Sequence, residues 1–280
     1  MTKIIDGKTL AEKILSKLKN QVSKLTYSPG LAVILVGDDP ASHLYIKLKE
    51  KAAKEVGIYF EKHLFSAYTQ EKEILGKIDH LNLNPKIHGI IVQLPLARHL
   101  DEDNIIKHIN WQKDADGFHP FNVKSLLSGR KVMEPGLIKS IFALLKQTKV
   151  NLKGKKVAIL ANSDVFIQPL KYILEKKKAE VVVKKSGEYF QDVTREADIV
   201  VVGYGRPRLI KANMIKEKAI LIDIGTNRTE EGKTVGDVDF EDIKEKASWL
   251  SPVPGGVGPL TVAYLLENTC LNAEFLNPKS

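Results

Sequence analysis

Short apolar, β-branched runs alternate with helix-length segments along most of the 280-residue chain. The runs have the length of single strands and lie at residues 31–36, 58–64, 88–93, 157–160, 180–183, 198–202 and 219–222. Helical patterns lie between them, at residues 42–56, 71–83 and 101–109 in the first half. This alternation is typical of parallel sheets whose strands are joined by helices. The sequence therefore predicts an α/β fold with parallel sheets.

A chain of this length can form two domains of ordinary size. The lysine-rich stretch before the strand at residue 157 has the character of a lead-in to a second α/β unit. A boundary is therefore expected between Phe121 and Asn151. We expect residues 1–120 to form the first domain and residues 121–280 the second.

The composition excludes several classes of protein. The chain is 43% hydrophobic and 28% charged, as in globular proteins, and no run reaches the ~18 apolar residues of a membrane span. The N-terminus has no apolar signal core, and the single cysteine, Cys270, excludes an intramolecular disulfide and a cysteine-based zinc cluster. We expect a cytoplasmic protein without a metal site or a membrane partner. The net charge is +9, but acidic residues interleave with most lysines, so no nucleic-acid partner is expected.

The segment from Ser251 to Val262 contains three prolines and three glycines, and an apolar helical pattern follows it. Proline fixes φ, whereas glycine permits positive φ and a close approach of the backbone to a ligand. Because free N–H groups at a helix N-terminus can meet an anionic or carbonyl ligand, the segment is a candidate binding loop. A rigid turn before the last helix is the alternative. That helix, at about residues 260–280, is expected to pack back on the first domain.

Tyr45 and Lys49 lie four residues apart, on one face of the helix predicted over residues 42–56. Such a lysine can be an ordinary surface residue, or it can have a lowered pKa and transfer protons while the tyrosine stacks on a flat ligand. Gln93 stands at the carboxyl end of a predicted strand, where α/β proteins bind ligands. Its amide can hold a lysine amine or a ligand carbonyl.

Residues 113–120 read Lys-Asp-Ala-Asp-Gly-Phe-His-Pro. Two acids in a turn that ends in glycine can form an Asx turn and nothing more. They can also supply a carboxylate to the N–H groups of a heterocycle. The turn holds too few carboxylates for a magnesium site.

Four segments together resemble the family of bifunctional methylenetetrahydrofolate dehydrogenases/methenyltetrahydrofolate cyclohydrolases. They are residues 42–53 (Ser-His-Leu-Tyr-Ile-Lys-Leu-Lys-Glu-Lys-Ala-Ala), 89–96 (Gly-Ile-Ile-Val-Gln-Leu-Pro-Leu), 113–120, and 252–262 (Pro-Val-Pro-Gly-Gly-Val-Gly-Pro-Leu-Thr-Val). The resemblance implies a homodimer whose N-terminal catalytic α/β domain and Rossmann-type NAD(P)-binding domain enclose a folate cleft. It also implies oxidation of 5,10-methylenetetrahydrofolate with NADP and hydrolysis of the methenyl product to 10-formyltetrahydrofolate.

The same resemblance implies roles for individual residues. Lys49 would be the catalytic lysine, Gln93 would position it, and Tyr45 would stack on the folate. Asp116 would bind the pterin, and a loop would close over the substrate, formed by Pro254, Gly255, Gly256 and Val257. The cofactor side would be formed by Ala161, Asn162, Ser163, Lys184, Lys185, Ser186 and Thr226.

The nucleotide side departs from the family pattern. The family reads Gly-Arg-Ser-x-x-Val-Gly-x-Pro after the first Rossmann strand, whereas residues 161–169 read Ala-Asn-Ser-Asp-Val-Phe-Ile-Gln-Pro. Both glycines, which let a pyrophosphate approach the backbone, are absent, and so is the arginine. Phe166 and Ile167 are expected to crowd the loop.

The next predicted strand ends in Val-Lys-Lys-Ser, with no acid until Glu188, which favours NADP over NAD. Lys184 or Lys185 would replace the missing arginine as a point charge, so NADP binding is expected to be weak or absent. Three functions stay open. They are the bifunctional enzyme, a cyclohydrolase without hydride transfer, and a non-catalytic folate-binding or dimer-partner protein.

Overall fold

The structure is a computed structural model that describes residues 2–130 and 132–277. The chain packs into two compact units, which we name by their sheets. The six-stranded unit contains residues 2–11 and Leu137–Thr261. The three-stranded unit contains Glu12–Gly136 and residues 262–277.

These units differ from the expected bounds of 1–120 and 121–280. Residues 121–136 belong to the three-stranded unit, where Asn122 of α5 (Pro120–Leu127) donates a hydrogen bond of 2.9 Å to the buried carboxylate of Asp114. Residues 2–11 belong to the six-stranded unit, because β1 (Lys3–Ile4) pairs with β11 (Trp249–Leu250). Residues 278–280, at the end of the C-terminal segment, lie outside the described residues.

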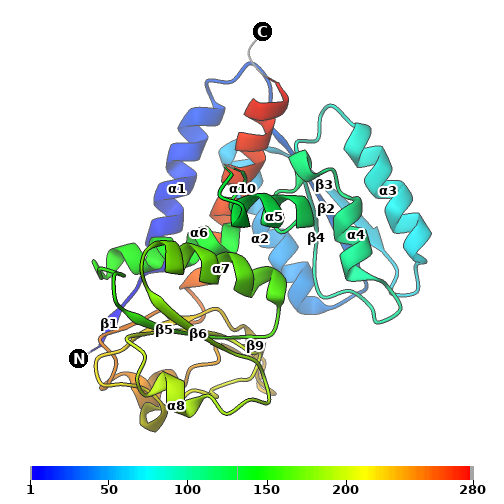
Figure 1. The fold of residues 1–280 in the computed structure, drawn as a ribbon. Coiled ribbons are helices and arrows are strands. Elements are labelled where there is room, and N and C mark those ends of the chain that lie inside the picture. Colours follow the sequence, from blue (N-terminus) through cyan, green and yellow to red (C-terminus); the bar gives the residue numbers. More distant parts are fainter. Residues whose placement is uncertain (1, 131, 278–280) are drawn as a thin grey trace. The chain divides into compact units, whose positions relative to one another are not determined.

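Three parallel strands form the sheet of the three-stranded unit, in the order β3-β2-β4 (Figure 1). They are β2 (Gly30–Val36), β3 (Tyr59–Phe65) and β4 (Gly89–Val92). The central β2 is buried along its whole length, as its continuous apolar run predicts. Because the strands are parallel, their carboxyl ends meet at one edge of the sheet.

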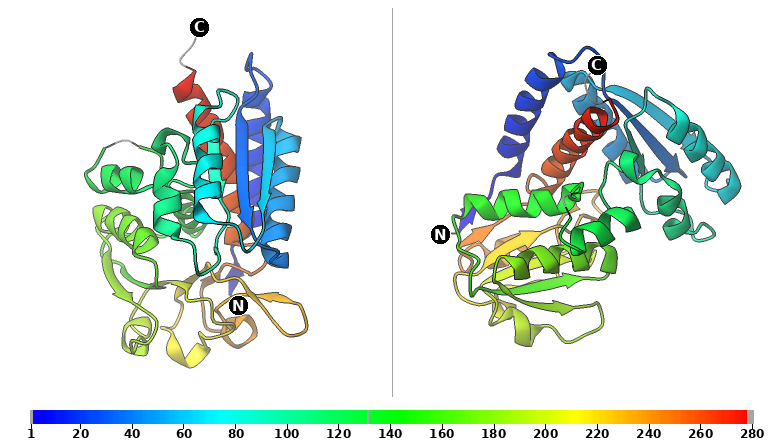
Figure 2. Two further views of the ribbon diagram at one scale, coloured as in Figure 1. Left: turned by 90° about the vertical axis from the view of Figure 1, so that its right-hand side faces the viewer. Right: turned by 45° about the horizontal axis from the view of Figure 1, so that its top comes forward.

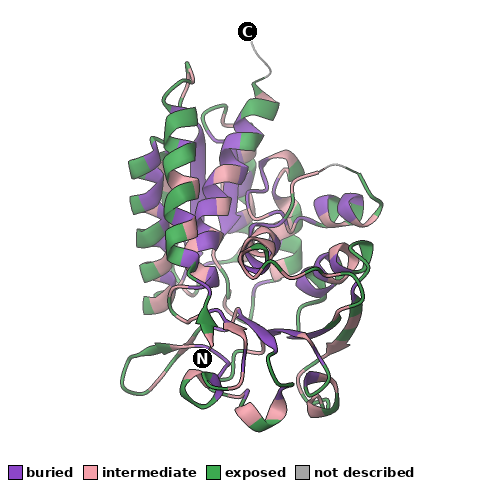
Figure 3. Cartoon of the chain, turned by 90° about the vertical axis from the view of Figure 1, so that its left-hand side faces the viewer, coloured by how far each residue is buried: buried purple, intermediate pink, exposed green. Residues whose placement is uncertain are grey.

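Helices cover both faces of this sheet. Successive residues of β2 point to opposite faces, so its apolar side chains need a partner on each side. Odd-numbered β2 residues pack with α1 (Gly7–Val22), α2 (Pro40–Val56) and α10 (Val257–Leu276). Even-numbered β2 residues pack with α3 (Glu71–Leu83) and α4 (Glu102–His108). Figure 3 shows the buried sides of the sheet and its helices in purple. A short helix, η1 (Trp111–Lys113), leads to the turn that carries Asp114 and Asp116.

The sheet of the six-stranded unit is also parallel, in the order β1-β11-β8-β7-β5-β6 (Figure 2). Besides β1 and β11 it contains β5 (Lys156–Ala161), β6 (Glu180–Lys184), β7 (Ile199–Gly203) and β8 (Ile220–Asp223). The chain adds β6 on one side of β5 and β7 on the other. The strand order therefore reverses beside β5, and α/β sheets bind ligands at the carboxyl ends of the strands at such a point.

The remaining elements of this unit are short or lie outside its sheet. The helices are α6 (Gly136–Gln147), α7 (Asp164–Lys176), α8 (Gln191–Thr194), α9 (Phe240–Ile243) and η2 (Ala212–Met214). A two-stranded hairpin joins β9 (Asn227–Arg228) to β10 (Thr234–Val235).

The seven strands and the three first-half helices expected from the hydrophobic pattern are present, and their ends are shifted by at most two residues, whereas the last helix begins three residues before its expected start. The last helix extends from Val257 to Leu276, and no helix in the described part of the chain is long and apolar enough to cross a membrane.

Candidate active site

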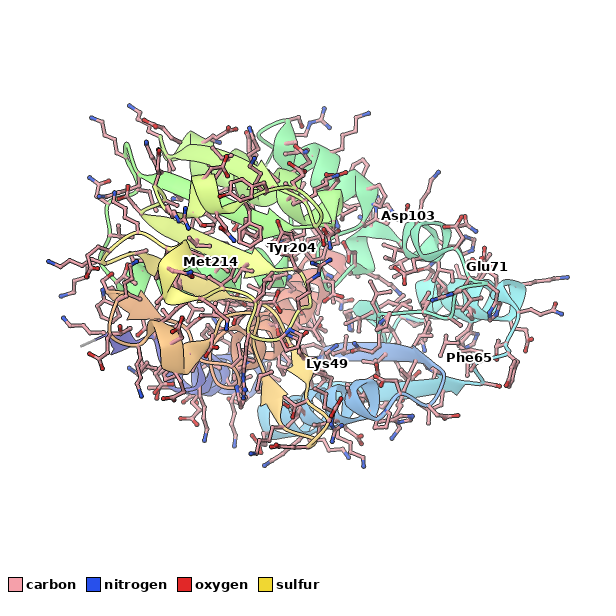
Figure 4. All side chains as sticks on the ribbon, turned by 90° about the horizontal axis from the view of Figure 1, so that it is seen from below. Lys49, Phe65, Glu71, Asp103, Tyr204 and Met214 are labelled. Carbon is pink, nitrogen blue, oxygen red and sulfur yellow. The ribbon has the colours of Figure 1, made fainter. Side chains whose placement is uncertain are left out.

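Helix α2 holds Lys49 and Tyr45 at the edge of the three-stranded sheet. The helix begins after Asp39, whose carboxylate accepts a hydrogen bond of 2.8 Å from the backbone N–H of Ser42. It ends at Gly57, which adopts the left-handed conformation that favours glycine. Lys49 is buried and only 9% exposed, whereas Tyr45, one turn earlier, stays partly exposed. Figure 4 labels Lys49 among the side chains. The interpretation of Lys49 as an ordinary surface lysine is therefore excluded.

Gln93 fixes the position of the Lys49 amine. The Lys49 Nζ donates a hydrogen bond of 2.8 Å to Gln93 Oε1, and Gln93 Nε2 donates one of 2.9 Å to the carbonyl oxygen of Leu94. The backbone N–H of Gln93 donates to the carbonyl oxygen of Ile34 in β2 at 2.8 Å, so the sheet itself holds this residue. The structure thus brings together two residues that are 44 positions apart in the sequence.

The two acids of residues 113–120 differ in their surroundings. Asp114 is buried, and its carboxylate accepts hydrogen bonds from the backbone N–H groups of Gly117 and His119 at 3.0 and 2.8 Å, and from Asn122. Asp114 therefore organises the turn, as an Asx-type interpretation predicts. Asp116 keeps some exposed surface.

Two neighbours of Asp114 also hold the turn. The amine of Lys113 donates hydrogen bonds of 3.1 and 2.8 Å to the carbonyl oxygens of Leu81 and Asn84, at the end of α3. Gly117 has a φ of +82°, and a Cβ at this position would lie 2.7 Å from Pro135 Cα. A larger residue does not fit at position 117, so glycine is required where the turn presents Asp116.

Lys49 and Asp116 perturb each other in this buried setting. Burial lowers the pKa of the Lys49 amine, and the negative charge of Asp116 opposes that shift. Burial raises the pKa of the Asp116 carboxyl to about 6, with Lys49 lowering it and Asp114 raising it further. Burial thus favours the neutral form of the Lys49 amine, which is the form that can accept a proton.

The proline- and glycine-rich loop belongs to the six-stranded unit. It leads directly into α10, which begins at Val257, as the candidate binding loop requires. Gly255 has a φ of +109°, and the N–H of Gly256 donates a hydrogen bond of 2.7 Å to the carbonyl oxygen of Pro252. Pro254 is exposed at the tip.

The predicted cofactor residues lie at the carboxyl edge of the six-stranded sheet. Ala161 ends β5 and Ser163 precedes α7, and the Asn162 Oδ1 between them accepts a hydrogen bond of 2.9 Å from the N–H of Ser186. Lys185 Nζ forms an ion pair of 2.8 Å with Asp164, and Lys184 Nζ lies 3.8 Å from a carboxylate oxygen of Asp192. Thr226 follows β8, which β7 separates from β5.

Phe166 and Ile167 do not crowd the loop, contrary to expectation. Both lie in α7 and are buried, at 6% and 1% exposure, because the helix turns them inward. The exposed residues in the first turn of α7 are Asp164 and Val165, and Asp164 is the charged one. Its carboxylate adds negative charge where the free N–H groups of a helix would otherwise attract a phosphate.

Residues 226–239 combine an exposed hairpin with a buried acid. The hairpin is mostly exposed, but Asp237 is fully buried. The Asp237 carboxylate accepts hydrogen bonds from the backbone N–H groups of three successive residues after β7, Tyr204, Gly205 and Arg206. Sequence reasoning missed Tyr204 and Asp237, and the only signal was the run Gly-Tyr-Gly-Arg-Pro directly after a predicted strand.

Two family models match the chain. The tetrahydrofolate dehydrogenase/cyclohydrolase catalytic domain matches residues 5–116, and the NAD(P)-binding domain of the same family matches residues 135–276. The chain belongs to the tetrahydrofolate dehydrogenase/cyclohydrolase family. It is a bifunctional dehydrogenase/cyclohydrolase of one-carbon folate metabolism, with an NAD(P)-binding domain. The family resemblance and the two-domain α/β fold expected from the sequence are confirmed.

Relatives in sequence and structure agree with this assignment. The chain is 46% identical to the bifunctional protein FolD of Nautilia profundicola, over 95% of each chain, and 45% identical to that of Bacillus subtilis, over 97% of each. The bifunctional dehydrogenase/cyclohydrolase of Campylobacter jejuni superposes with a TM-score of 0.93 at 40% identity, covering 98% of this chain and 99% of the other. The Trypanosoma brucei dehydrogenase-cyclohydrolase, solved with NADP and an inhibitor, gives a TM-score of 0.93 at 32% identity, covering 98% of each chain.

Proposed function

We propose that Lys49 is the proton-transfer group for hydrolysis of 5,10-methenyltetrahydrofolate to 10-formyltetrahydrofolate. The observation that carries the proposal is the buried Lys49 amine, which is hydrogen-bonded to Gln93 and close enough to Asp116 for each charge to affect the other's pKa. Burial that lowers an amine's pKa leaves a neutral fraction able to accept a proton at working pH.

In this mechanism water attacks the bridging carbon between the two folate nitrogens. The neutral Lys49 amine accepts a proton from that water as the carbon–oxygen bond forms. It returns the proton to the ring nitrogen N5 when the bond between N5 and the carbon breaks. The remaining hydroxyl proton leaves to solvent as the formyl C=O forms, so the step consumes one water and releases one proton.

The neighbouring residues bind and orient. Gln93 would hold the Lys49 amine toward the reacting carbon through its 2.8 Å hydrogen bond. Tyr45, partly exposed one helical turn away, would stack on the folate ring, and Asp116 would accept hydrogen bonds from the pterin N–H groups. The loop of Pro254, Gly255, Gly256 and Val257 would close over the substrate.

The decisive experiment compares Lys49→Met with the parent protein. Methionine keeps much of the stem and removes the amine, so we expect methenyltetrahydrofolate hydrolysis to fall by about two orders of magnitude or more. Lys47→Met is the matched control, because Lys47 is an exposed lysine of the same helix. Near-normal turnover of the Lys49 variant in a spectrophotometric assay would exclude this role for Lys49.

We also propose that the dinucleotide is NADP and that it binds weakly. NADP, when bound, would accept the hydride from 5,10-methylenetetrahydrofolate. The turn after β5 lacks the glycines that let a pyrophosphate approach, and both candidate lysines face carboxylates. If no dinucleotide bound at all, a cyclohydrolase without hydride transfer would be the alternative. The family assignment decides against the third function considered from the sequence, a non-catalytic folate-binding or dimer-partner protein.

A cytoplasmic homodimer is the assembly that we propose. Strand β3 is an edge strand of its sheet, and an unpaired edge can accept a second strand. Leu64 of β3 is 54% exposed, and Leu44 and Leu48, four residues apart on α2, are 52% and 47% exposed. These three leucines, which we call the β3–α2 patch, would be covered in the dimer.

A further inference from the structure

Tyr204 connects two strands that are not neighbours. It follows β7, and its hydroxyl donates a hydrogen bond of 2.7 Å to the carbonyl oxygen of Lys184, the last residue of β6. Strand β5 lies between them, with Ala161 paired to Gly203 and Leu160 paired to Lys184. Because neighbouring strands are about 4.8 Å apart, the phenol has to pass across the carboxyl end of β5 to reach its partner.

The surroundings hold this side chain in place. Both carboxylate oxygens of the fully buried Asp237 accept hydrogen bonds from the backbone of the Tyr204 turn, the shortest being 2.6 Å from the Tyr204 N–H. The Tyr204 ring lies 6.1 Å from the ring of Phe190, centroid to centroid. Burial raises the pKa of the Tyr204 hydroxyl to about 12, so it stays a hydrogen-bond donor at neutral pH. Figure 4 labels Tyr204 on its turn.

Two further contacts tie together the same edge. Asn162 accepts a hydrogen bond from the N–H of Ser186, and Lys185 pairs with Asp164. Both join the turn after β5 to the turn after β6, beside the position where the strand order reverses. A dinucleotide crosses a doubly wound sheet at this place, next to the turn after the first strand. In this arrangement the Asn162–Ser186 and Lys185–Asp164 contacts close the edge of the sheet where a dinucleotide would bind, so these contacts do not fit a bound dinucleotide.

We propose that Tyr204 competes internally with the cofactor. Its side chain occupies the carboxyl end of β5, which the dinucleotide needs, and it turns away before NADP binds. The apparent dissociation constant then equals the intrinsic constant divided by the fraction of molecules with Tyr204 turned away. This inference rests on the proposal that NADP binds weakly, and it names Tyr204 as a cause of the weak binding.

The test is a calorimetric titration of the full chain with NADP+, and with NAD+ in parallel. Tyr204→Ala removes the ring and its hydrogen bond, and we expect the dissociation constant for NADP+ to fall about tenfold, the effect of losing one buried hydrogen bond and a ring contact. Tyr204→Phe keeps the ring and removes the hydroxyl, so we expect an intermediate fall. Tyr189→Ala is the matched control, because Tyr189 follows β6 in the same unit but is 62% exposed. It should change affinity by less than about twofold.

The melting temperature of each variant shows whether it has folded. Unchanged or weaker NADP+ binding by a folded Tyr204→Phe or Tyr204→Ala variant would overturn the inference. An equal gain in NADP+ affinity in the Tyr189→Ala control would also overturn the inference, because the effect would not depend on the Tyr204 contact. The wild-type titration tests the underlying proposal separately. Tight wild-type binding that is insensitive to salt would contradict the weak site, whereas the ratio between variants tests Tyr204 alone.

Discussion

At the scale of single residues, two nearby aspartates, Asp114 and Asp116, differ in their contacts. Asp114 and Asp116 are two positions apart, yet Asp114 accepts two hydrogen bonds within its own turn and a third from Asn122 of α5. Asp116 instead faces a buried amine, and its pKa is raised to about 6. Local contacts thus decide that Asp114 shapes the turn, and they leave Asp116 as the acid proposed to bind the pterin.

The raised pKa of Asp116 predicts a pH dependence of folate binding. The carboxyl is protonated below about pH 6 and ionised above it, and only the ionised form accepts charge-assisted hydrogen bonds from a pterin. Tetrahydrofolate affinity should therefore rise about tenfold between pH 5 and pH 7 and then level off. Titrations across this range measure it.

Asp116→Asn should remove the pH dependence and weaken binding at pH 7 by roughly ten- to a hundredfold. Asp103→Asn, which changes an exposed acid of α4 in the same way, should behave like the parent protein. A pH dependence that survives in the Asp116 variant would show that another group titrates.

At the scale of elements, the N-terminus of α7 has the position of a phosphate-binding helix without its chemistry. The helix begins beside the carboxyl end of β5, but Asp164 stands in its first turn and pairs with Lys185. The acid stabilises the helix end and gives Lys185 a partner within the protein. The same contact therefore favours the folded unit and disfavours an anionic ligand.

Asp164→Asn should strengthen NADP+ binding about three- to tenfold at low ionic strength, because it removes one repelling charge and releases Lys185. The gain should shrink in high salt, since the charges are exposed and screened. Glu175→Gln makes the same charge change in the last turn of α7 and is the control. Equal binding by the parent and the Asp164 variant at both salt concentrations would contradict this prediction.

At the scale of the whole molecule, the edge strand β3 and the exposed leucines of the β3–α2 patch form a surface suited to association. Strand β3 has a partner on one side only within the described chain, and the β3–α2 patch places three leucines beside it. Surfaces of this kind mark association sites in stable proteins. A second copy of the chain is the partner that fits the proposed dimer.

Leu64→Glu should therefore shift the protein from a dimer to a monomer. Light scattering coupled to gel filtration should give about twice the chain mass of 31.2 kDa for the parent protein and about that mass for the variant. Leu83→Glu is the control, because Leu83 is 85% exposed at the end of α3, outside the patch. A parent protein that is already monomeric, or a variant that stays dimeric, would rule out this interface.

Much of the fold could be predicted because it depends on local patterns. The run at residues 31–36 has no polar position, so it indicated a strand buried on both faces, and β2 is one. By contrast β1 and β11 have two residues each and pair across almost the whole chain, so no local pattern could reveal them. Their pairing also decides that the N-terminal residues belong to the six-stranded unit.

The sequence by itself determined the family and the α/β class, and it predicted four folate-side residues, because helical spacing and strand ends fix where side chains such as Lys49 and Gln93 lie. The tertiary structure alone decided what those groups and their neighbours do. Burial set the pKa directions of Lys49 and Asp116, and the helical phase of α7 turned Phe166 and Ile167 inward. The strand order brought Tyr204 across β5 to Lys184. Desolvation and contacts between distant residues depend on how elements pack, and that information lies in no single segment of the chain.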